Sequence, residues 1–455
     1  VLSGQYGRDV GARWRAAGPG GSQGQLWVGR AAPGAWPAEP GWSVLAYLQR
    51  LDLGAWADAL KPLAGAMPEG GSSGGGGAGL SRLEARTDCL SDGDRCLGTL
   101  TIDASPRFSR GARQWQAALG GSLVDGQVTY RPGVAQPLVL DLDRLVLDSL
   151  IPESGQTAVQ GAESGSLFGE LEVTSAPAAF PQRVRELPDG RLTIDDIVYQ
   201  GNRVGPFNGA WRSSSDRLSV EPVSLTLGEV TAEGSLVWEA SGSQASLTRS
   251  RLALTGGDPG TALAALGQDV AVRAERLDVD SQLAWPGAPW QFALARSRGS
   301  LNVDMVDGTF ANISSPSAKV VGLLNVDNLL RRLRLDFSDV TGEGTAFDRV
   351  SGAATLYGGV LETEGPIRID GPATDFTLDG SADLARRQLD LMLGVTVPVS
   401  NNLPLAAVAV GAPVVGGALF VADKLFGDVI DRVTRIHYLV QGPWTSPRIT
   451  LESAQ

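Results

Sequence analysis

The chain has 455 residues with 38 basic and 50 acidic side chains, a formal charge of −12 and no basic cluster. This excludes nucleic-acid binding, which depends on phosphate neutralisation by Lys and Arg, and tight adhesion to an anionic lipid surface. The sequence opens on "VLSGQYGRDVG" without a charged-then-apolar signal segment, and an alternating pattern is already running. We therefore expect it to be the C-terminal portion of a longer protein.

Residues 1–66 contain alternating stretches that predict strands, which we expect to continue a sheet that begins upstream. Within them, "LGAWADALKPLAG" at 53–65 has apolar residues at helical spacing and predicts a short helix. Residues 67–80 are interpreted as a linker, because "MPEGGSSGGGGAG" is too rich in glycine to order itself. These glycines do not predict a phosphate-binding loop, since no Gly-Lys-Ser/Thr and no helix start follow them.

Cys89 and Cys96 are the only cysteines, and they lie in residues 81–152, a predicted β-meander. The six residues between them are rich in Asp, Gly and Ser, which predicts a hairpin loop with the cysteines opposite each other at its base. A disulfide would indicate an oxidising compartment such as the periplasm; two free thiols on neighbouring strands are the alternative. A zinc site is not expected, because it needs about four ligands and His437 is the only histidine.

A loop at 153–167 leads into the longest predicted region, residues 168–400, in which apolar and polar residues alternate. Two helices interrupt this region. One is predicted near 258–267, where an Asp-Pro pair supplies an N-cap and a first helical residue. The other is predicted at 315–332, which has a broad apolar face.

The alternation has a period of two residues, which is typical of strands with one apolar and one polar face. In "SLNVDM", Leu301, Val303 and Met305 share one face, whereas Asn302 and Asp304 share the other. Asp-Gly pairs in "LPDGR", "LVDGQ", "MVDGT" and "LDGSA" predict antiparallel hairpin turns. Roughly 20 to 25 strands at about 4.8 Å spacing would form a sheet on the order of 100 Å long. Its apolar face must therefore either fold over into a closed core or form a trough that something else fills.

Near the C-terminus, "LPLAAVAVGAPVVGGALFVA" (403–422) lacks charge and has the length of a membrane span. Its two prolines, and a helical periodicity that continues beyond it, instead predict a short apolar segment and an amphipathic helix at about 413–435. Residues 401–436 form this element, and closing strands follow at 437–455.

Three interpretations of this element stay open: a membrane span, a plug for the sheet end, and an interfacial element that touches a membrane. In the last interpretation, the membrane-contacting residues are Leu403, Leu405, Val408, Val414, Val415, Leu419, Phe420, Leu425 and Phe426.

Residues suited to catalysis are sparse. A Ser-His-Asp or Cys-His arrangement would need His437, which lies in the strand-like "RIHYLVQG", and the sequence contains no nucleophile-elbow, zinc-protease or P-loop motif. Asp141 and Asp143 share a strand face, and Asp195 and Asp196 are adjacent, so a glycosidase pair is one interpretation. Acids on the solvated face of amphipathic strands explain all of them. We expect no catalytic residue, no cofactor and no metal.

From about residue 190 onward, the order of features resembles the AsmA-like superfamily, and specifically the YhdP-type proteins of Gram-negative envelopes. The most specific block is "LLRRLRLDFSDVTGEGTAFDRVSGAATLYGGVLETEGPIRIDGPATDFTLDGSADLARRQLDLMLGVTVPVS", continued by "VGAPVVGGALFVADKLFG" and "YLVQGPWTSPRI". Upstream, "LQRLDLGAWADAL" and "LVLDLDRLVLD" are similar to that family less strongly. The Gly-rich stretch and the cysteine pair depart from it.

This resemblance implies a bridge-like lipid transporter: a mainly β protein with a long curled antiparallel sheet that forms an apolar groove. Such a protein would lie in the periplasm, reach from an inner-membrane anchor towards the outer membrane and support the outer-membrane barrier. Its implied partners are phospholipid acyl chains and the periplasmic leaflet of the outer membrane, and no further envelope partner is identified.

Acyl chains would lie along the apolar strand faces while headgroups stay in water. The expected groove lining is Leu218, Val220, Leu236, Trp238, Leu277, Val279, Leu283, Trp285, Leu301, Val303, Met305, Leu333, Leu335, Phe337, Leu389, Leu391, Leu393, Val395 and Val397. The same residues would fill a structural or adhesive β-scaffold with a closed core. Periodicity alone does not separate the two.

Overall fold

The computed structural model describes residues 1–18, 21–37, 39–52, 79–109, 112–150, 176–199, 201–242, 244–311, 345–372, 374–384, 386–398, 433–443 and 447–454. These residues form 24 strands of one mixed sheet, with two short α-helices and three 3-10 turns between them. The mainly β fold predicted from the alternation is therefore confirmed. Contacts divide the chain into two units, Val1–Glu153 with Glu186–Ser213, and Ser154–Arg185 with Ser214–Gln455.

The first unit contains twelve strands and one 3-10 turn. They are β1 (Leu2–Tyr6), β2 (Val10–Gly18), β3 (Gly21–Val28), β4 (Gly41–Asp52), β5 (Leu80–Asp92), β6 (Arg95–Ser109), β7 (Ala112–Gly120), β8 (Val124–Tyr130), β9 (Leu138–Val146), η1 (Leu147–Ser149), β10 (Gly190–Tyr199), β11 (Asn202–Val204) and β12 (Phe207–Ser213). Strands β10 to β12 thus belong with β9, although the sequence placed them in the region that begins at residue 168.

The expectation of a wholly antiparallel sheet is wrong in the first unit. Strands β3 and β4, β4 and β5, and β9 and β10 pair in parallel. Parallel neighbours need long crossover connections, whereas a hairpin can be joined by two residues. The linker predicted at 67–80 lies in the crossover from β4 to β5, except that Leu80 already begins β5, and the loop predicted at 153–167 lies between β9 and β10. A period-two pattern is the same for either strand direction, so alternation alone could not reveal this.

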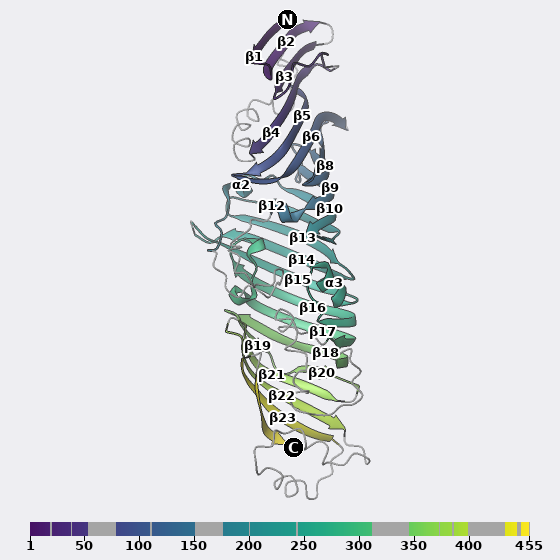
Figure 1. Ribbon diagram of the computed structural model, residues 1–455, viewed down its shortest axis with the longest axis vertical. Helices are drawn as coiled ribbons and strands as arrows, with labels where there is room; N and C mark the ends of the chain where they lie inside the picture. Colours follow the sequence, from purple (N-terminus) through teal and green to yellow (C-terminus); the bar gives the residue numbers. More distant parts are fainter. Residues whose placement is uncertain are drawn as a thin grey trace, which may run out of the picture. The chain divides into compact units, whose positions relative to one another are not determined.

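The second unit is antiparallel throughout its described pairs. Its elements are α2 (Gln182–Arg185), β13 (Arg217–Leu227), β14 (Val230–Ala240), β15 (Ser246–Gly256), α3 (Pro259–Ala265), β16 (Val272–Pro286), η2 (Pro289–Gln291), η3 (Leu294–Arg296), β17 (Arg298–Phe310), β18 (Thr345–Tyr357), β19 (Val360–Thr363), β20 (Ile367–Asp370), β21 (Asp375–Asp383), β22 (Gln388–Pro398), β23 (Val433–Pro443) and β24 (Arg448–Ala454). Figure 1 shows β13 to β17 side by side in chain order, and α3 at one end of these strands.

Helix α3 begins at the Asp-Pro pair. The backbone N–H of Gly260 donates to the Asp258 carboxylate at 2.8 Å, which satisfies one of the free donors of the first turn. The same carboxylate pairs with Arg273 on β16 at 3.1 Å. Asp258 therefore both starts the helix and joins it to the sheet.

The Asp-Gly pairs do not form the predicted hairpin turns. Gly126, Gly308 and Gly380 lie inside β8, β17 and β21, and Gly190 is the first residue of β10. The pairing of β8 with β9 shifts register between Asp125 and Gly126, where Gly126 has a φ of 145°. Asp and Gly adopt positive φ more readily than most residues, and positive φ is needed at irregularities within twisted strands as well as in turns.

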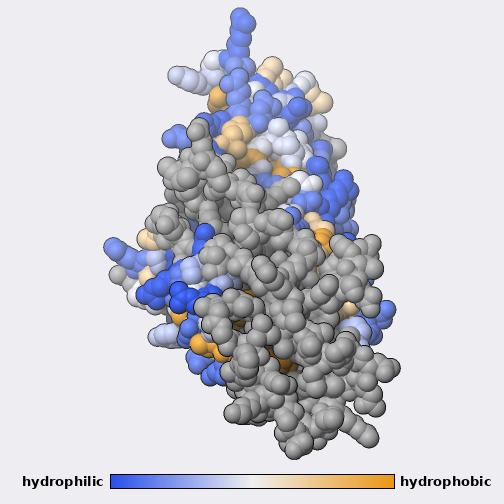
Figure 2. Space-filling view, turned by 60° about the horizontal axis from the view of Figure 1, so that its bottom comes forward, coloured by the Kyte–Doolittle hydropathy of each residue, from blue (hydrophilic) through white to orange (hydrophobic). Residues whose placement is uncertain are grey.

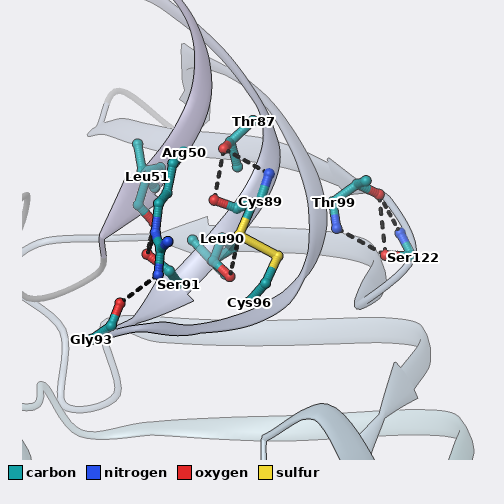
Figure 3. The surroundings of a disulfide bond; sticks show 10 residues. All are labelled: Arg50, Leu51, Thr87, Cys89, Leu90, Ser91, Gly93, Cys96, Thr99 and Ser122. Atoms are coloured by element: carbon teal, nitrogen blue, oxygen red, sulfur yellow. Dashed lines mark hydrogen bonds between the residues drawn. A yellow bond between two sulfur atoms is a disulfide. The ribbon is translucent and has the colours of Figure 1, made fainter.

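The cysteine hairpin is tighter than expected. Asp92 pairs with Arg95, so the strands continue past both cysteines to a two-residue turn instead of opening into a six-residue loop. The sulfur atoms of Cys89 and Cys96 are joined in a disulfide, with the Cα atoms 5.5 Å apart (Figure 3). Beside it, Arg50 on β4 donates to Ser91 at 3.1 Å and to the carbonyl of Gly93 at 2.8 Å. The disulfide joins the two strands of the hairpin, and the Arg50 bonds hold its turn against the parallel neighbour β4.

Several predicted elements lie outside the described residues: the helices at 53–65 and 315–332 and most of the 401–436 element. The end of that last element was placed too late, because β23 already begins at Val433 and pairs with β22. The β-branched run Val433, Thr434 and Ile436 favours a strand there. Within the part of the chain that the structure describes, no helix has both the length and the apolar character needed to cross a bilayer.

Candidate functional site

Apolar side chains form a continuous row across one face of the second unit. Directly paired positions on β16, β17, β18, β20, β21, β22 and β23 are occupied by Leu277, Met305, Val350, Ile369, Phe376, Val395 and Ile436. They belong to one hydrophobic cluster, in which Val350 is 0% and Val395 is 1% exposed. Because paired residues on neighbouring strands point to the same face, the period-two alternation produces an apolar surface that runs across the strands.

The predicted lining residues that the structure describes lie on this face but differ in burial. Eight are buried: Trp238, Leu277, Trp285, Met305, Leu389, Leu391, Leu393 and Val395. Seven are half-buried: Leu218, Val220, Leu236, Val279, Leu283, Leu301 and Val303. Val397 pairs with Thr434 through its backbone. Leu333, Leu335, Phe337 and all nine predicted membrane-contacting residues fall outside the described residues.

Two of the buried residues are covered by aromatic side chains of the protein itself. Trp238 makes edge-on contacts with Phe180 and Trp290, with ring centroids 5.1 and 5.3 Å away. Trp285 contacts Phe292 in the same way at 5.0 Å. Both indole N–H groups are satisfied, that of Trp238 by Ser246 at 2.8 Å and that of Trp285 by the Ala288 carbonyl at 3.0 Å. At this end of β13 to β16, the apolar face is closed by protein.

Strand β15 carries lining residues that alternation did not reveal. Ser246, Thr248 and Ser250 are buried between the apolar rows of β14 and β16. Thr248 donates to the Gly287 carbonyl at 2.8 Å, and Ser246 donates to the Ala178 carbonyl. A hydroxyl bonded to backbone leaves no unsatisfied polar group, so Ser246 and Thr248 can lie on an apolar face. The sequence signal for these residues is weak, because small polar residues at alternate positions of a strand predict a face exposed to water.

The first unit has two apolar rows of its own, which the predicted lining omitted. One is Val28, Ala46, Ala85, Ile102, Leu119, Gly126, Leu142, Ile194 and Phe207, paired in register from β3 to β12. The second, called the upper row below, is Ala12, Leu26, Val44, Leu83, Ala104, Ala117, Val128, Leu140, Leu192 and Gly209. For β9, the sequence signal of these rows is the alternation of apolar and polar residues in "LVLDLDRLVLD".

Most of the upper row remains half-exposed. Leu26 is 36% exposed, and Val44, Leu83, Val128 and Leu140 are only partly buried. Folded proteins rarely leave contiguous apolar surface in water unless something binds to it. This row therefore marks a surface suited to an apolar ligand.

Charged side chains gather on the opposite face. Glu239 pairs with Arg217 at 3.2 Å and with Arg249 at 2.7 Å across β13, β14 and β15, and Arg349 pairs with Asp304 across β17 and β18. On the side of the molecule shown in Figure 2, the described residues are mostly hydrophilic, with hydrophobic patches between them. The sheet is thus amphipathic, with one face suited to water and the other to apolar groups.

The apolar rows offer no acid–base or metal chemistry. Tyr438, on β23 opposite Leu393, belongs to the same hydrophobic cluster as the row of the second unit, and burial raises the pKa of its phenol. The described segments contain no group of three or more His, Cys, Asp or Glu side chains that could hold a metal ion. What the arrangement offers is a non-directional apolar surface.

The comparisons with known proteins agree with this arrangement. The profile of the family described as "YhdP protein" matches residues 2–449. The protein from Escherichia coli (strain K12) named "Intermembrane phospholipid transporter YhdP" is 30% identical over 280 residues, a match that covers 60% of this chain and 22% of that protein. No solved structure matches significantly. This chain, which spans about a fifth of that relative, belongs to the YhdP family.

Proposed function

We propose that this chain is a periplasmic part of a bridge-like lipid transporter that carries phospholipid between the inner and outer membranes. Acyl chains would lie along the apolar rows of the sheet while headgroups remain in water, so movement would need neither a tight site nor a catalytic residue. By this route the protein would support the outer-membrane barrier. Contact of residues 403–426 with the outer-membrane leaflet remains a prediction.

The observation that carries the proposal is the half-exposed upper row. Its residues are apolar and in register from β2 to β12, yet several are only partly covered by protein. A ligand made of long hydrocarbon chains fits a row of this kind, because burial of apolar area is its only requirement. The name of the Escherichia coli relative points to phospholipid as that ligand.

The proposed path omits Trp238 and Trp285. Their faces are occupied by Phe180, Trp290 and Phe292, so acyl chains would have to displace aromatic packing to reach them. Half-buried positions such as Val279 and Val303 remain in the path.

A closed β-scaffold is the second candidate. It is favoured by the complete burial of Val350, Leu393, Val395 and Val440, which are 0–1% exposed. A face that protein already fills leaves no room for lipid in that part of the sheet.

Photo-crosslinking separates the two. A photo-reactive amino acid would replace Val303 in one sample and Asn302 in another; these neighbours on β17 point to opposite faces. After incubation with phosphatidylethanolamine vesicles and illumination, mass spectrometry would detect lipid adducts. The transporter predicts an adduct at 303 and little at 302. Equal labelling of both, or none at either, would contradict the groove and favour the scaffold.

A further inference from the structure

Aromatic side chains form a row at one end of the first unit's strands. Trp14, Trp42, Trp115, Tyr130 and Trp211 each lie two residues beyond a member of the upper row and therefore on the same face. Trp115 and Tyr130 are directly paired across β7 and β8. We call these five residues the aromatic row.

Packing over glycine explains part of this row. A Cβ on Gly24 would lie 2.4 Å from the Trp42 ring, and one on Gly190 would lie 2.5 Å from the Trp211 ring, so both indoles lie across a neighbouring strand. Trp115 and Tyr130 have no such glycine beneath them. Tyr130 is 38% exposed, and Trp115 is half-buried. These two present aromatic surface at the boundary between the apolar face and water.

A cationic side chain, Arg113, lies one position further out on the same face. Arg113 pairs in register with Phe108, which is 79% exposed, and its guanidinium carbon lies 5.5 Å from the centroid of the Trp115 ring. It donates to the carbonyl of Leu80, which positions the guanidinium but leaves most of its donors available. Arg131 lies at the same end of the strands but donates to Gln114 at 2.9 Å on the other face, so it is not part of this site. Within the described segments, neither arginine forms an ion pair with an acidic side chain.

The opposite end of these strands differs in character. Leu90, Leu97, Leu100, Leu123 and Val124 are buried there, at 4–9% exposure. The character of the side chains on this face therefore changes along the strands of the first unit. It runs from buried aliphatic residues, through half-exposed aliphatic and aromatic residues, to a cationic residue. A phospholipid has the same order from its chain ends to its phosphate, and Trp and Tyr favour the ester level between hydrocarbon and water.

We propose that the aromatic row binds the glycerol-ester region of a glycerophospholipid and that Arg113 contacts its phosphate, so that every lipid in the first unit has its headgroup at this end of the strands. This inference rests on the proposed function. It adds the orientation of the ligand and the residues that impose it.

The test uses the unaltered chain and two phosphatidylethanolamine probes, one with a diazirine on the headgroup and one with a diazirine at the end of an acyl chain. We expect the headgroup probe to label peptides that contain Arg113, Trp115 or Tyr130. The acyl probe should label peptides with Leu83, Ile102 or Leu140, which are half-buried aliphatic residues further along the same face. If the acyl probe labels the protein but the headgroup probe labels the opposite end of the strands, or both ends equally, the proposed orientation is wrong but the proposed function is not contradicted. Absence of labelling by either probe would contradict the proposed function as well.

Substitutions of Arg113 and Trp115, each with a control variant, test the roles proposed for these two residues. Arg113→Gln should lower headgroup labelling by up to about fivefold, the effect expected of one exposed charged contact. Arg191→Gln is the matched control, since Arg191 is an exposed arginine on the other face of β10. Trp115→Leu should lower headgroup labelling but preserve acyl labelling, and Trp115→Tyr should restore the former. Equal effects of the two arginine variants, or no loss in Trp115→Leu, would overturn the assignment.

Discussion

Tyr438 shows how the apolar face acts on a single side chain. Its ring lies opposite Leu393 and is 4% exposed, among aliphatic residues of β22 and β23. The phenolate form loses its hydration there, so burial raises the pKa of the phenol above its ordinary value of 10.0. The neutral form is the one that the folded protein accommodates.

This shift makes stability fall in alkali. Above the unfolded pKa, unfolding releases the Tyr438 proton, so the stabilisation present below a pH of about 10 is lost as the pH rises towards the folded pKa. Tyr438→Phe should unfold in urea with a smaller decline in midpoint between about pH 8 and pH 11. Tyr357→Phe, which alters a side chain that is 75% exposed, should retain the full decline. The same decline in all three proteins would contradict the role of Tyr438.

At the scale of elements, α3 depends on a side chain that also touches the sheet. Asp258 caps the helix through Gly260 and pairs with Arg273 on β16. Helix α3 is short, so its stability comes from this cap and from packing rather than from helix propensity.

Asp258→Ala should therefore lower the free energy of unfolding by about 1 kcal/mol, because a backbone donor at the helix start loses its acceptor. Asp258→Asn keeps an acceptor and should lose much less. Urea unfolding followed by circular dichroism would measure both. Asp278→Ala, an exposed change on the polar face of β16, is the control and should have little effect. An equal loss in the Asp258→Ala and Asp278→Ala variants would rule out the cap.

At the scale of the whole molecule, the proposed function depends on apolar rows that cross many strands. Where a row is only half-buried, a charge introduced into it should weaken lipid binding more than it destabilises the fold. The charge would be transferred into hydrocarbon only when lipid is bound. Leu140 and Asp141 on β9 offer a matched pair, since they are neighbours that point to opposite faces.

Leu140→Lys should therefore lower the phospholipid that co-purifies with the chain by about half or more, whereas Asp141→Lys should leave it unchanged. Phosphorus analysis of the purified proteins would measure the difference, and circular dichroism would show whether both variants are folded. Equal lipid content in two folded variants would argue against the upper row as part of the path.

The sequence by itself determined which residues share a face. A strand places alternate side chains on opposite sides, so the apolar positions of "SLNVDM" and "QLDLMLGV" had to lie together wherever the strand was placed. It also determined the start of α3, because an N-cap followed by proline is a local signal that needs no distant contact.

Only the tertiary structure decided strand direction and the covering of the apolar face. Parallel pairing of β9 with β10 depends on a crossover that brings distant segments together, and alternation is the same for either direction. Likewise, Trp238 is covered because Phe180 and Trp290 reach it from other parts of the chain, whereas Val303 shows the same alternation and remains half-exposed. The period of a strand is set by its own backbone, but the burial of its side chains is set by whatever packs on them.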